Sequence, residues 1–176
     1  MSLPIQKTKI QTARLTLHPC TDQDTDALVR LLTNPCITRT FLVPDLATPQ
    51  QAEDLARTLI AFSQTDDTAH LMTGIYQSGA LIGFVLDCGV QANEIEIGYV
   101  IAPDQQGHGY ASEAVRAVLQ TLREMGFRRV SAGYFVENTA SLRVMQKCGM
   151  RQSDQLDTVD YRGQRHACRY CELIFA

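Results

Sequence analysis

The chain of 176 residues has no hydrophobic run that is long enough to cross a bilayer. Its longest clearly apolar stretch lies near residues 80–86, whereas a membrane-spanning helix needs about 20 apolar residues in succession. The opening stretch, M-S-L-P-I-Q-K-T, also lacks the apolar centre of a signal peptide. We therefore expect a cytoplasmic protein with no membrane partner.

The chain also lacks a strong charge of either sign. Its 16 Lys and Arg residues and 19 Asp and Glu residues give a formal net charge of −3. Proteins that bind nucleic acid carry an excess of basic residues, which attracts phosphate groups. We therefore expect no nucleic-acid partner. The composition and length fit one globular domain over residues 1–176, and they leave both a monomer and a homodimer open.

A disulfide framework is missing too, because the six cysteines are spread along the chain. Only Cys168 and Cys171, with His166 close by, have a spacing that suggests a metal or redox pair. The segment that carries them is expected to be a strand, in which residues three apart point to opposite faces. A second pair of ligands is absent from the sequence, so we expect no metal site.

The N-terminal third predicts one strand and two helices. Alternation of apolar and polar residues over residues 12–19 indicates a half-buried strand. Helix starts follow at Thr21 and at Thr48, each of which is a good N-cap residue. Between the two helices, residues 36–47 are expected to be irregular. They can wall a pocket or simply form a surface loop.

The rest of the chain predicts a mostly antiparallel sheet with helices on its faces. Strands are expected at residues 70–77, 80–88, 94–101, 127–136, 150–161 and 166–175. A long helix is expected from Ala111 to Met125, because apolar residues recur there at intervals of four and three. A short helix follows from Asn138 to Lys147. The expected fold is mixed α/β, with about seven strands and about four helices.

The stretch over residues 94–111, E-I-E-I-G-Y-V-I-A-P-D-Q-Q-G-H-G-Y-A, joins a predicted strand to the long helix through a glycine-rich bend. Gly109 has no Cβ, so a pyrophosphate can approach its backbone closely. The N–H groups from Gly107 to Ala111 would point at such a ligand, and the helix dipole would favour its negative charge. The alternative is a glycine turn that tight packing alone requires.

Two other phosphate-binding motifs do not fit this bend. A P-loop needs Lys and Ser or Thr directly after its glycine, but Tyr110 and Ala111 stand there. The dinucleotide-binding motif G-x-G-x-x-G needs a third glycine, which is missing after Gly109.

Three motifs in order and spacing resemble the GNAT superfamily of acyl-CoA-dependent N-acetyltransferases. They are E-I-G-Y-V-I, Q-x-x-G-x-A over residues 106–111, and N-T-A-S-L-R-V-M-Q-K-C-G-M from Asn138 onwards. With T-A-R-L-T-L near the N-terminus, they most resemble the ribosomal-protein N-terminal acetyltransferase branch, the RimJ/RimL type. The resemblance implies a sheet that splays open in the middle.

The resemblance also implies acetyl-CoA as the co-substrate. It would lie with its pyrophosphate on the bend formed by Gln106, Gly107, His108, Gly109, Tyr110 and Ala111. The backbones of Val100 and Ile101 would bind the pantetheine arm, and Asn138 and Ser141 would lie near the other end of the cofactor. His108 is expected to be exposed and neutral, and the other histidines to have ordinary packing or surface roles.

Amide formation from an amine and a thioester needs a base, a donor for the oxyanion and a proton for the departing thiolate. Glu96 is the first candidate for the base, because it lies on one strand face with Glu94 and nearer the expected splay. Glu137, at the end of the next strand, is the second candidate. Each carboxylate can instead be merely solvated or ion-paired. A backbone N–H at Val100 or Ile101 is the expected oxyanion donor.

The candidate acid follows from a departure from the wider superfamily. Many members carry a tyrosine seven residues after the capping asparagine, where this chain has Met145. By resemblance to the branch, Ser141 takes the contact with the CoA sulfur. Ser141 can instead serve only the first turn of its own helix, and Asn138 can be only an N-cap.

Taken together, these features predict an enzyme that moves an acetyl group from acetyl-CoA to a primary amine. Direct attack in a ternary complex is expected, since no cysteine has the setting of a nucleophile. The acceptor is a protein N-terminus or, alternatively, a small-molecule amine. A domain that only senses acyl-CoA is a further alternative, because Met145 replaces the tyrosine.

Overall fold

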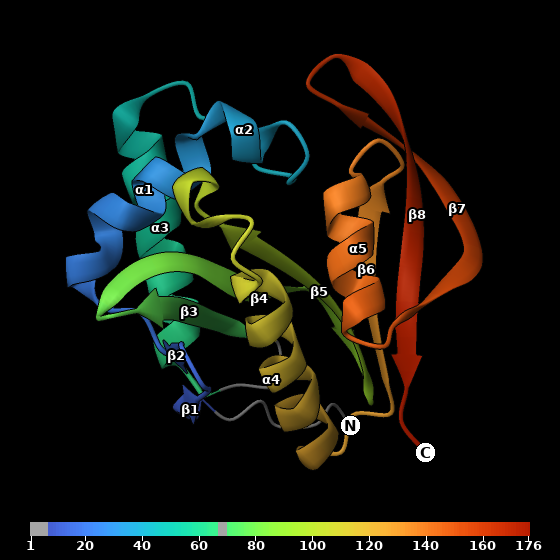
Figure 1. Ribbon diagram of the computed structural model, residues 1–176. Helices are drawn as coiled ribbons and strands as arrows, with labels where there is room; N and C mark the ends of the chain where they lie inside the picture. Colours follow the sequence, from blue (N-terminus) through green and yellow to red (C-terminus); the bar gives the residue numbers. More distant parts are fainter. Residues whose placement is uncertain (1–6, 67–69) are drawn as a thin grey trace.

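The structure is a computed structural model that describes residues 7–66 and 70–176 (Figure 1). Its strands are β1 (Ile10–Gln11), β2 (Thr16–His18), β3 (Met72–Gln77), β4 (Ala80–Gln91), β5 (Glu94–Ile101), β6 (Arg129–Phe135), β7 (Arg151–Tyr161) and β8 (Gln164–Ile174). Its helices are α1 (Thr25–Thr33), α2 (Pro35–Thr38), α3 (Pro49–Gln64), α4 (Tyr110–Glu124) and α5 (Thr139–Lys147), with short 3₁₀ turns η1 (Asp22–Asp24) and η2 (Pro103–Gln105).

The strands form a single sheet in the order β1-β2-β3-β4-β5-β6-β8-β7. Neighbouring strands run antiparallel, except that β5 and β6 are parallel. This confirms the predicted mixed α/β fold with a mostly antiparallel sheet. The sheet has one strand more than the predicted number, because β1 lies just before the predicted strand at residues 12–19 and pairs with β2.

The fifth helix, α2, lies where the sequence predicted irregular structure, so that prediction is wrong for residues 36–38. Asn34 accepts a hydrogen bond from the backbone N–H of Cys36, and Pro35 is the first helical residue. Asn34-Pro35 therefore both ends α1 and begins α2. The predicted cap at Thr21 precedes the 3₁₀ turn η1, which leads directly into α1.

Two apolar clusters hold the helices to opposite faces of the sheet. The cluster under α4 contains Ile95, Ile97 and the partly buried Tyr99. The cluster under α1 and α3 contains Val100 and Phe84. Because successive side chains of a strand point to opposite faces, this division places Glu94 and Glu96 of β5 on the face of α1 and α3; the alternation predicted that the two share a face.

The parallel strands β5 and β6 pair at only three positions, Glu94 with Arg129, Ile95 with Val130 and Glu96 with Ser131. Beyond Glu96 the two strands diverge, as Figure 1 shows between α4 and α5. At the paired end, the guanidinium of Arg129 lies 3.1 Å from Glu94 on β5 and 2.6 Å from Glu172 on β8. The sheet is thus closed at one end of β5 and open at the other.

Candidate active site

The open end of β5 leads through η2 into the glycine bend and then into α4. Gly107 and Gly109 both have φ +80°, in the left-handed region that side chains disfavour. The turn itself therefore favours glycine at both positions through its backbone conformation, whereas tight packing does not require Gly107, because a Cβ there would meet open space. The same turn places the first N–H groups of α4 beside the open end of β5, where β5 and β6 have diverged. These N–H groups have no partner within the helix. A phosphate would fit there.

Gln106 links the C-terminal end of β5 to the bend, because its side-chain amide donates to the backbone oxygen of Ile101 at 3.0 Å. His108 is exposed and stacks on Tyr110, with ring centroids 5.5 Å apart. Tyr110 is the first residue of α4, and Ala111 follows it. The six predicted residues of the bend therefore form one continuous surface at the start of α4.

An arginine that the sequence analysis did not single out holds this bend in place. Arg14 donates to the backbone oxygen of His108 at 2.8 Å and to the carboxylate of Glu113 at 2.7 Å. Its guanidinium also lies 4.7 Å from the centre of the Tyr110 ring. The available signal was the T-A-R-L-T-L motif, which carries Arg14.

Glu113, in the first turn of α4, is the anchor of this network. Burial acts to raise its pKa, but hydrogen bonds from Thr12 and Arg14 outweigh that effect and leave the pKa below its ordinary value. The hydroxyl of Thr12 donates at 2.7 Å and the backbone N–H of Arg14 at 2.8 Å. An ionised Glu113 thus fixes the N-terminal segment against the start of α4.

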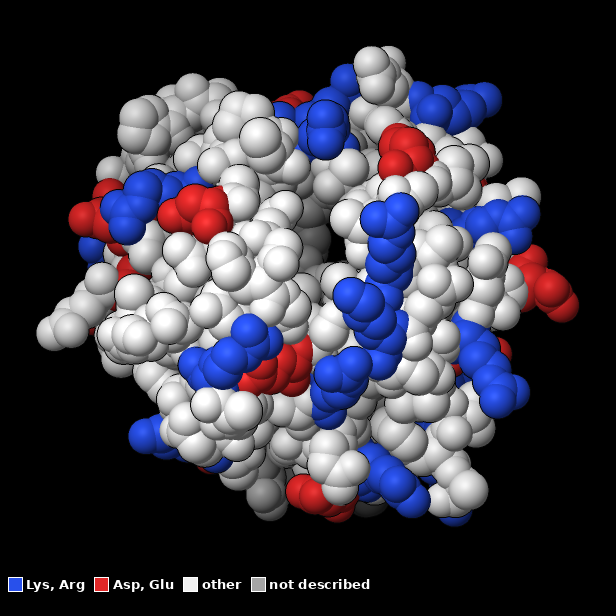
Figure 2. Space-filling view, viewed as in Figure 1, with Lys and Arg blue, Asp and Glu red and all other residues white. Residues whose placement is uncertain are grey.

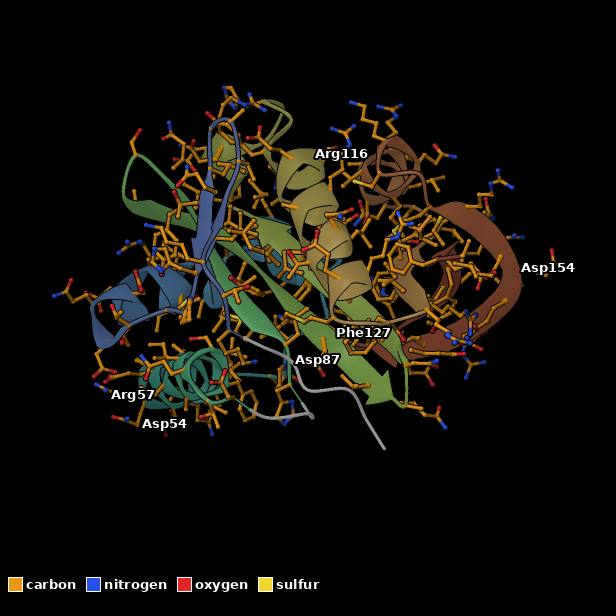
Figure 3. The ribbon with its side chains drawn as sticks, turned by 90° about the horizontal axis from the view of Figure 1, so that it is seen from below. Asp54, Arg57, Asp87, Arg116, Phe127 and Asp154 are labelled. Atoms are coloured by element: carbon orange, nitrogen blue, oxygen red, sulfur yellow. The ribbon has the colours of Figure 1, made fainter. Side chains whose placement is uncertain are left out.

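Helices α4 and α5 border a hollow in the middle of one face of the molecule (Figure 2). Lys and Arg side chains gather along one side of this hollow (Figure 2). The sequences of the two helices supply Arg116 on α4 and Arg143 and Lys147 on α5. Arg116 joins the helices by donating to the backbone oxygen of Lys147 at 2.9 Å, and it lies between them in Figure 3.

The direction of the backbone groups distinguishes Val100 from Ile101, the two residues predicted to bind a ligand through their backbones. Alternate residues of a strand direct their N–H and C=O groups to opposite edges. Ala102 donates to Ile82 on β4 at 2.7 Å, and a Cβ on Gly83 of β4 would meet the Val100 oxygen. The backbone N–H and C=O groups of Val100 therefore point to β4, and those of Ile101 point to the splay. The geometry favours Ile101 over Val100 as a donor to a ligand.

Glu96 stands at the last paired position, where the splay begins. Its carboxylate Oε1 lies 3.4 Å from the place that a Cβ on Gly133 of β6 would occupy. Burial, and then the charge of Asp157, raise the pKa of Glu96 above its ordinary value of 4.5. A half-buried carboxylate with a raised pKa is a better proton acceptor at neutral pH than a solvated one.

Glu137 has a different setting from Glu96. Its carboxylate lies 2.6 Å from Nδ1 of His166, and half of its side chain is exposed. Its own backbone N–H, and then His166, lower its pKa. His166, for which no partner was predicted, also stacks on Phe135 at 4.2 Å. The two candidate bases therefore differ in their surroundings: the pKa of Glu96 is raised, whereas Glu137 is paired with His166 and its pKa is lowered.

The start of α5 brings a serine to the splay from the α4 side. Asn138 is an N-cap, since its side-chain oxygen accepts from the backbone N–H of Ser141 at 3.2 Å. The hydroxyl of Ser141 lies 2.9 Å from the phenol of Tyr99 on β5. Tyr99 was not predicted as a site residue, although the E-I-G-Y motif carries it. Met145 is buried in the core and has no proton to give.

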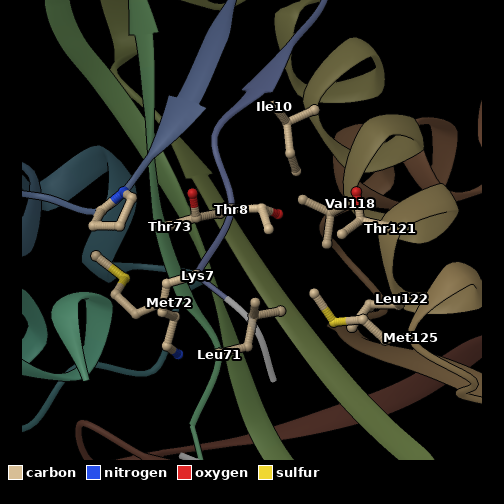
Figure 4. Close-up of a pocket in the computed structure, with 11 residues that line it drawn as sticks. Lys7, Thr8, Ile10, Leu71, Met72, Thr73, Val118, Thr121, Leu122 and Met125 are labelled. Carbon is tan, nitrogen blue, oxygen red and sulfur yellow. The ribbon is translucent and has the colours of Figure 1, made fainter. Parts of the chain in front are cut away.

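Other features of the described residues lie outside this site. A small apolar pocket involves the C-terminal half of α4, far along the helix from the bend (Figure 4). The Thr73 hydroxyl beside it is buried without a hydrogen-bond partner among the described residues. All six cysteines lie among the described residues and are free. The described residues contain no cluster of three or more potential metal ligands. None of the described helices has the length and hydropathy to span a membrane.

The family model of the acetyltransferase (GNAT) domain matches residues 14–151. The chain therefore belongs to the GNAT acetyltransferase family and is an acyltransferase enzyme. An uncharacterised N-acetyltransferase of Bacillus subtilis, YoaA, is 29% identical over 161 residues, which cover 87% of this chain and 88% of YoaA. The predicted family is confirmed.

Solved structures share the fold at lower identity. RimL, a ribosomal L7/L12 α-N-protein acetyltransferase in complex with coenzyme A, superposes with a TM-score of 0.82 at 17% identity, covering 96% of this chain and 98% of RimL. MccE, a microcin C7 self-immunity acetyltransferase in complex with acetyl-CoA and AMP, gives a TM-score of 0.80 at 16% identity, covering 93% of this chain and 94% of MccE.

Proposed function

We propose that this enzyme transfers an acetyl group from acetyl-CoA to a primary amine by direct attack in a ternary complex. One observation carries the proposal: the splay between β5 and β6 opens beside the N-terminus of α4, with Glu96 on one face of the sheet and Ser141 on the other. A thioester held in the splay would lie between a proton acceptor and a proton donor.

The residues of the chain fit acetyl-CoA. Gly107 has open space where a Cβ would lie, so a pyrophosphate can approach the bend. The N–H groups at the start of α4 and the basic side chains of α4 and α5 would bind the phosphates. The edge of β5 that β6 leaves unpaired beyond Glu96 would bind the pantetheine arm, as a partner strand would. Asn138 would act by fixing the start of α5.

Three groups then divide the chemistry. Glu96 takes a proton from the amine, directly or through water, which frees the lone pair for attack. The backbone N–H of Ile101 stabilises the oxyanion of the tetrahedral intermediate. Ser141 gives its hydroxyl proton to the sulfur as the thiolate departs. Glu137 is the weaker candidate for the base, because His166 already occupies its carboxylate.

For the acceptor we propose the N-terminal amine of a protein. Its support is the resemblance of the sequence motifs to the RimJ/RimL branch, together with the fold that the chain shares with RimL. The acceptor would reach the splay from the face of α1 and α3, where Glu96 lies. Phe41 of the segment after α2 packs there, 3.0 Å from the place that a Cβ on Gly98 would occupy.

A small-molecule amine is the second candidate, and the contacts of Tyr161 favour it. The hydroxyl of Tyr161, at the tip of the β7–β8 hairpin, donates to the Thr38 oxygen at 2.6 Å. It also accepts from the Val43 backbone N–H at 3.2 Å. These bonds fasten the segment after α2 to the hairpin and narrow the approach for a long peptide.

The test is free-thiol release from acetyl-CoA in the presence of N-terminal peptides or small amines, together with melting in the presence of CoA. We expect CoA to raise the melting temperature and one class of amine to release thiol. Stabilisation by CoA without release by any amine would contradict catalysis and indicate an acyl-CoA sensor. If CoA leaves the melting temperature unchanged, the assignment of the glycine bend is wrong.

A further inference from the structure

The phenol of Tyr99 lies between two oxygen atoms of a single residue on α5. Its oxygen is 2.9 Å from the hydroxyl oxygen of Ser141 and 3.0 Å from the carbonyl oxygen of the same residue. A carbonyl oxygen only accepts hydrogen bonds, whereas a hydroxyl can donate one and accept others. The single proton of Tyr99 therefore has two acceptors at nearly equal distance.

Both sides of this contact are held by the backbone. Tyr99 lies on β5 beyond Glu96, where β6 has already diverged, and its ring packs with the α4 cluster. Ser141 lies in the first turn of α5, which the side chain of Asn138 caps. The phenol thus bridges β5 and α5 at the splay.

The two available protons allow two arrangements. In the first, Tyr99 donates to the Ser141 carbonyl and accepts the Ser141 hydroxyl proton, so that both protons are in use. In the second, Tyr99 donates to the Ser141 hydroxyl oxygen, and the serine proton is free to point into the splay. Changing from one arrangement to the other requires only rotation of two O–H bonds.

We propose that Tyr99 is a positioning residue, which donates to the Ser141 hydroxyl oxygen and thereby directs the serine proton at the departing thiolate. The inference rests on the proposed function, in which Ser141 protonates the sulfur. As the serine O–H bond breaks and the S–H bond forms, negative charge develops on the serine oxygen. The phenol O–H of Tyr99 stabilises that charge, since a hydrogen bond to an ionised oxygen is the stronger kind.

The protons balance over one turnover. The attacking ammonium loses two protons: one passes through Glu96 to water, and the second passes to water as the tetrahedral intermediate collapses, so each turnover releases one proton in all. The sulfur gains one proton from Ser141, and the serine regains a proton from water after the thiol leaves. Tyr99 keeps its own proton throughout. Burial supports this role, because it raises the pKa of the phenol and keeps it protonated.

The experiment compares Tyr99→Phe and Ser141→Ala, alone and combined, with wild-type enzyme. The Phe variant keeps the ring in the core and removes only the hydroxyl. We expect its kcat to fall about tenfold, the loss of one good hydrogen bond, while KM for acetyl-CoA changes less than about twofold. In the Ser141→Ala background the same change should have no further effect, because the two groups act as a unit.

The matched control is Tyr76→Phe on β3, which removes a buried phenol that donates to Asp24 at 2.7 Å, two strands away from the splay. It should lower the melting temperature and leave kcat unchanged. The inference is overturned if Tyr99→Phe retains the wild-type kcat, or if it lowers kcat equally with and without Ser141.

If Tyr99→Phe does not fold, Ser141→Ala still tests the inference, because the Ser141→Ala variant leaves the packing of the Tyr99 ring intact. A full rate in Ser141→Ala would leave nothing for Tyr99 to position and would overturn the inference while the enzyme still transferred acetyl groups. If the wild-type enzyme releases no thiol with any amine, the proposed function fails, and the inference falls with it.

Discussion

The two ends of β5 differ in the elements that lie beside them. At the closed end, β5 pairs with β6, and Arg129 bridges Glu94 and Glu172. At the open end, β6 no longer pairs with β5, and the Tyr99 phenol reaches α5 instead. One end contributes to stability and the other provides a slot, and Tyr99 lies only three positions after Glu96.

The difference shows how a single strand can support both purposes. Pairing with β4 along its length, and with β6 and the ion pairs at one end, holds β5 in place, so the open end keeps its geometry without β6. A binding slot on a rigid element is more precise than one on a loop. The variants below either break this division of roles or sharpen it.

The largest effect should follow from Glu96→Gln, with Glu94→Gln as its matched control on the same strand face. We expect kcat of Glu96→Gln to fall about 100-fold, the lower range for loss of a general base, with little change in CoA binding. Glu94→Gln, at the closed end, should retain kcat and lose only some stability through Arg129. Equal rates in the two variants, measured by thiol release, would remove Glu96 from the mechanism.

The pH dependence should come from the same carboxylate. Glu96 must be ionised to accept a proton, and burial raises its pKa above 4.5. Activity should therefore be full above the raised pKa and decrease as the pH falls through it. In a profile of kcat/KM against pH, this acidic limb should disappear in Glu96→Gln. A limb that persists in the variant belongs to another group.

A smaller effect is expected from Arg14→Met, which keeps an apolar chain over the Tyr110 ring and removes the bonds to the bend. KM for acetyl-CoA should rise about fivefold, the cost of about 1 kcal/mol in positioning, while kcat stays within about twofold. Arg123→Met is the matched control, since Arg123 lies 6.0 Å from the Phe175 ring at the far end of α4. If both variants raise KM equally, the bend does not depend on Arg14.

Arg14→Met should also change acid stability, with a sign that follows from Glu113. The lowered pKa of Glu113 means that its stabilising contribution is full above the ordinary pKa of 4.5 and is lost as the pH falls through the lowered value. Removing Arg14 moves this pKa back up, so acid unfolding should begin at a higher pH. An unchanged acid transition, followed by circular dichroism, would show that Glu113 does not need Arg14.

The smallest effect should follow from Arg129→Met at the closed end. Loss of partly exposed ion pairs costs about 1 kcal/mol, which lowers the melting temperature by about 2–4 °C. Activity below the transition should stay within about twofold. The control is Arg165→Met, whose pair with Asp160 is largely exposed and should contribute nothing measurable. A large loss of activity in Arg129→Met would show that the closed end controls the slot directly.

The sequence predicted those elements whose signals are local. The regular spacing of apolar residues marked α4, Asn138 marked the start of α5, and alternation placed Glu96 on the same strand face as Glu94. The helix α2 was missed because its signal, Asn34-Pro35, also reads as the end of a helix. The six residues of the predicted bend, 106–111, lie together because they are consecutive in the sequence.

Contacts between distant residues could not be predicted in this way. Arg14 bonds to the backbone of His108, 94 residues further along the chain, and the Tyr99 and Ser141 hydroxyls come from segments 42 residues apart. The pair of Glu137 and His166 depends on the register between β6 and β8. No periodicity encodes these distances, because they arise from how strands pair and helices pack.

The sequence by itself determined the family, most of the α/β elements and the position of the glycine bend, since motifs, caps and hydrophobic periodicity act over a few residues. Only the tertiary structure decided where β5 and β6 part, which edge Ile101 presents and which hydroxyl lies beside Ser141. The physical reason is that a free strand edge and a buried hydroxyl pair both depend on the relative positions of whole elements. Those positions are set by the two cores on opposite faces of the sheet.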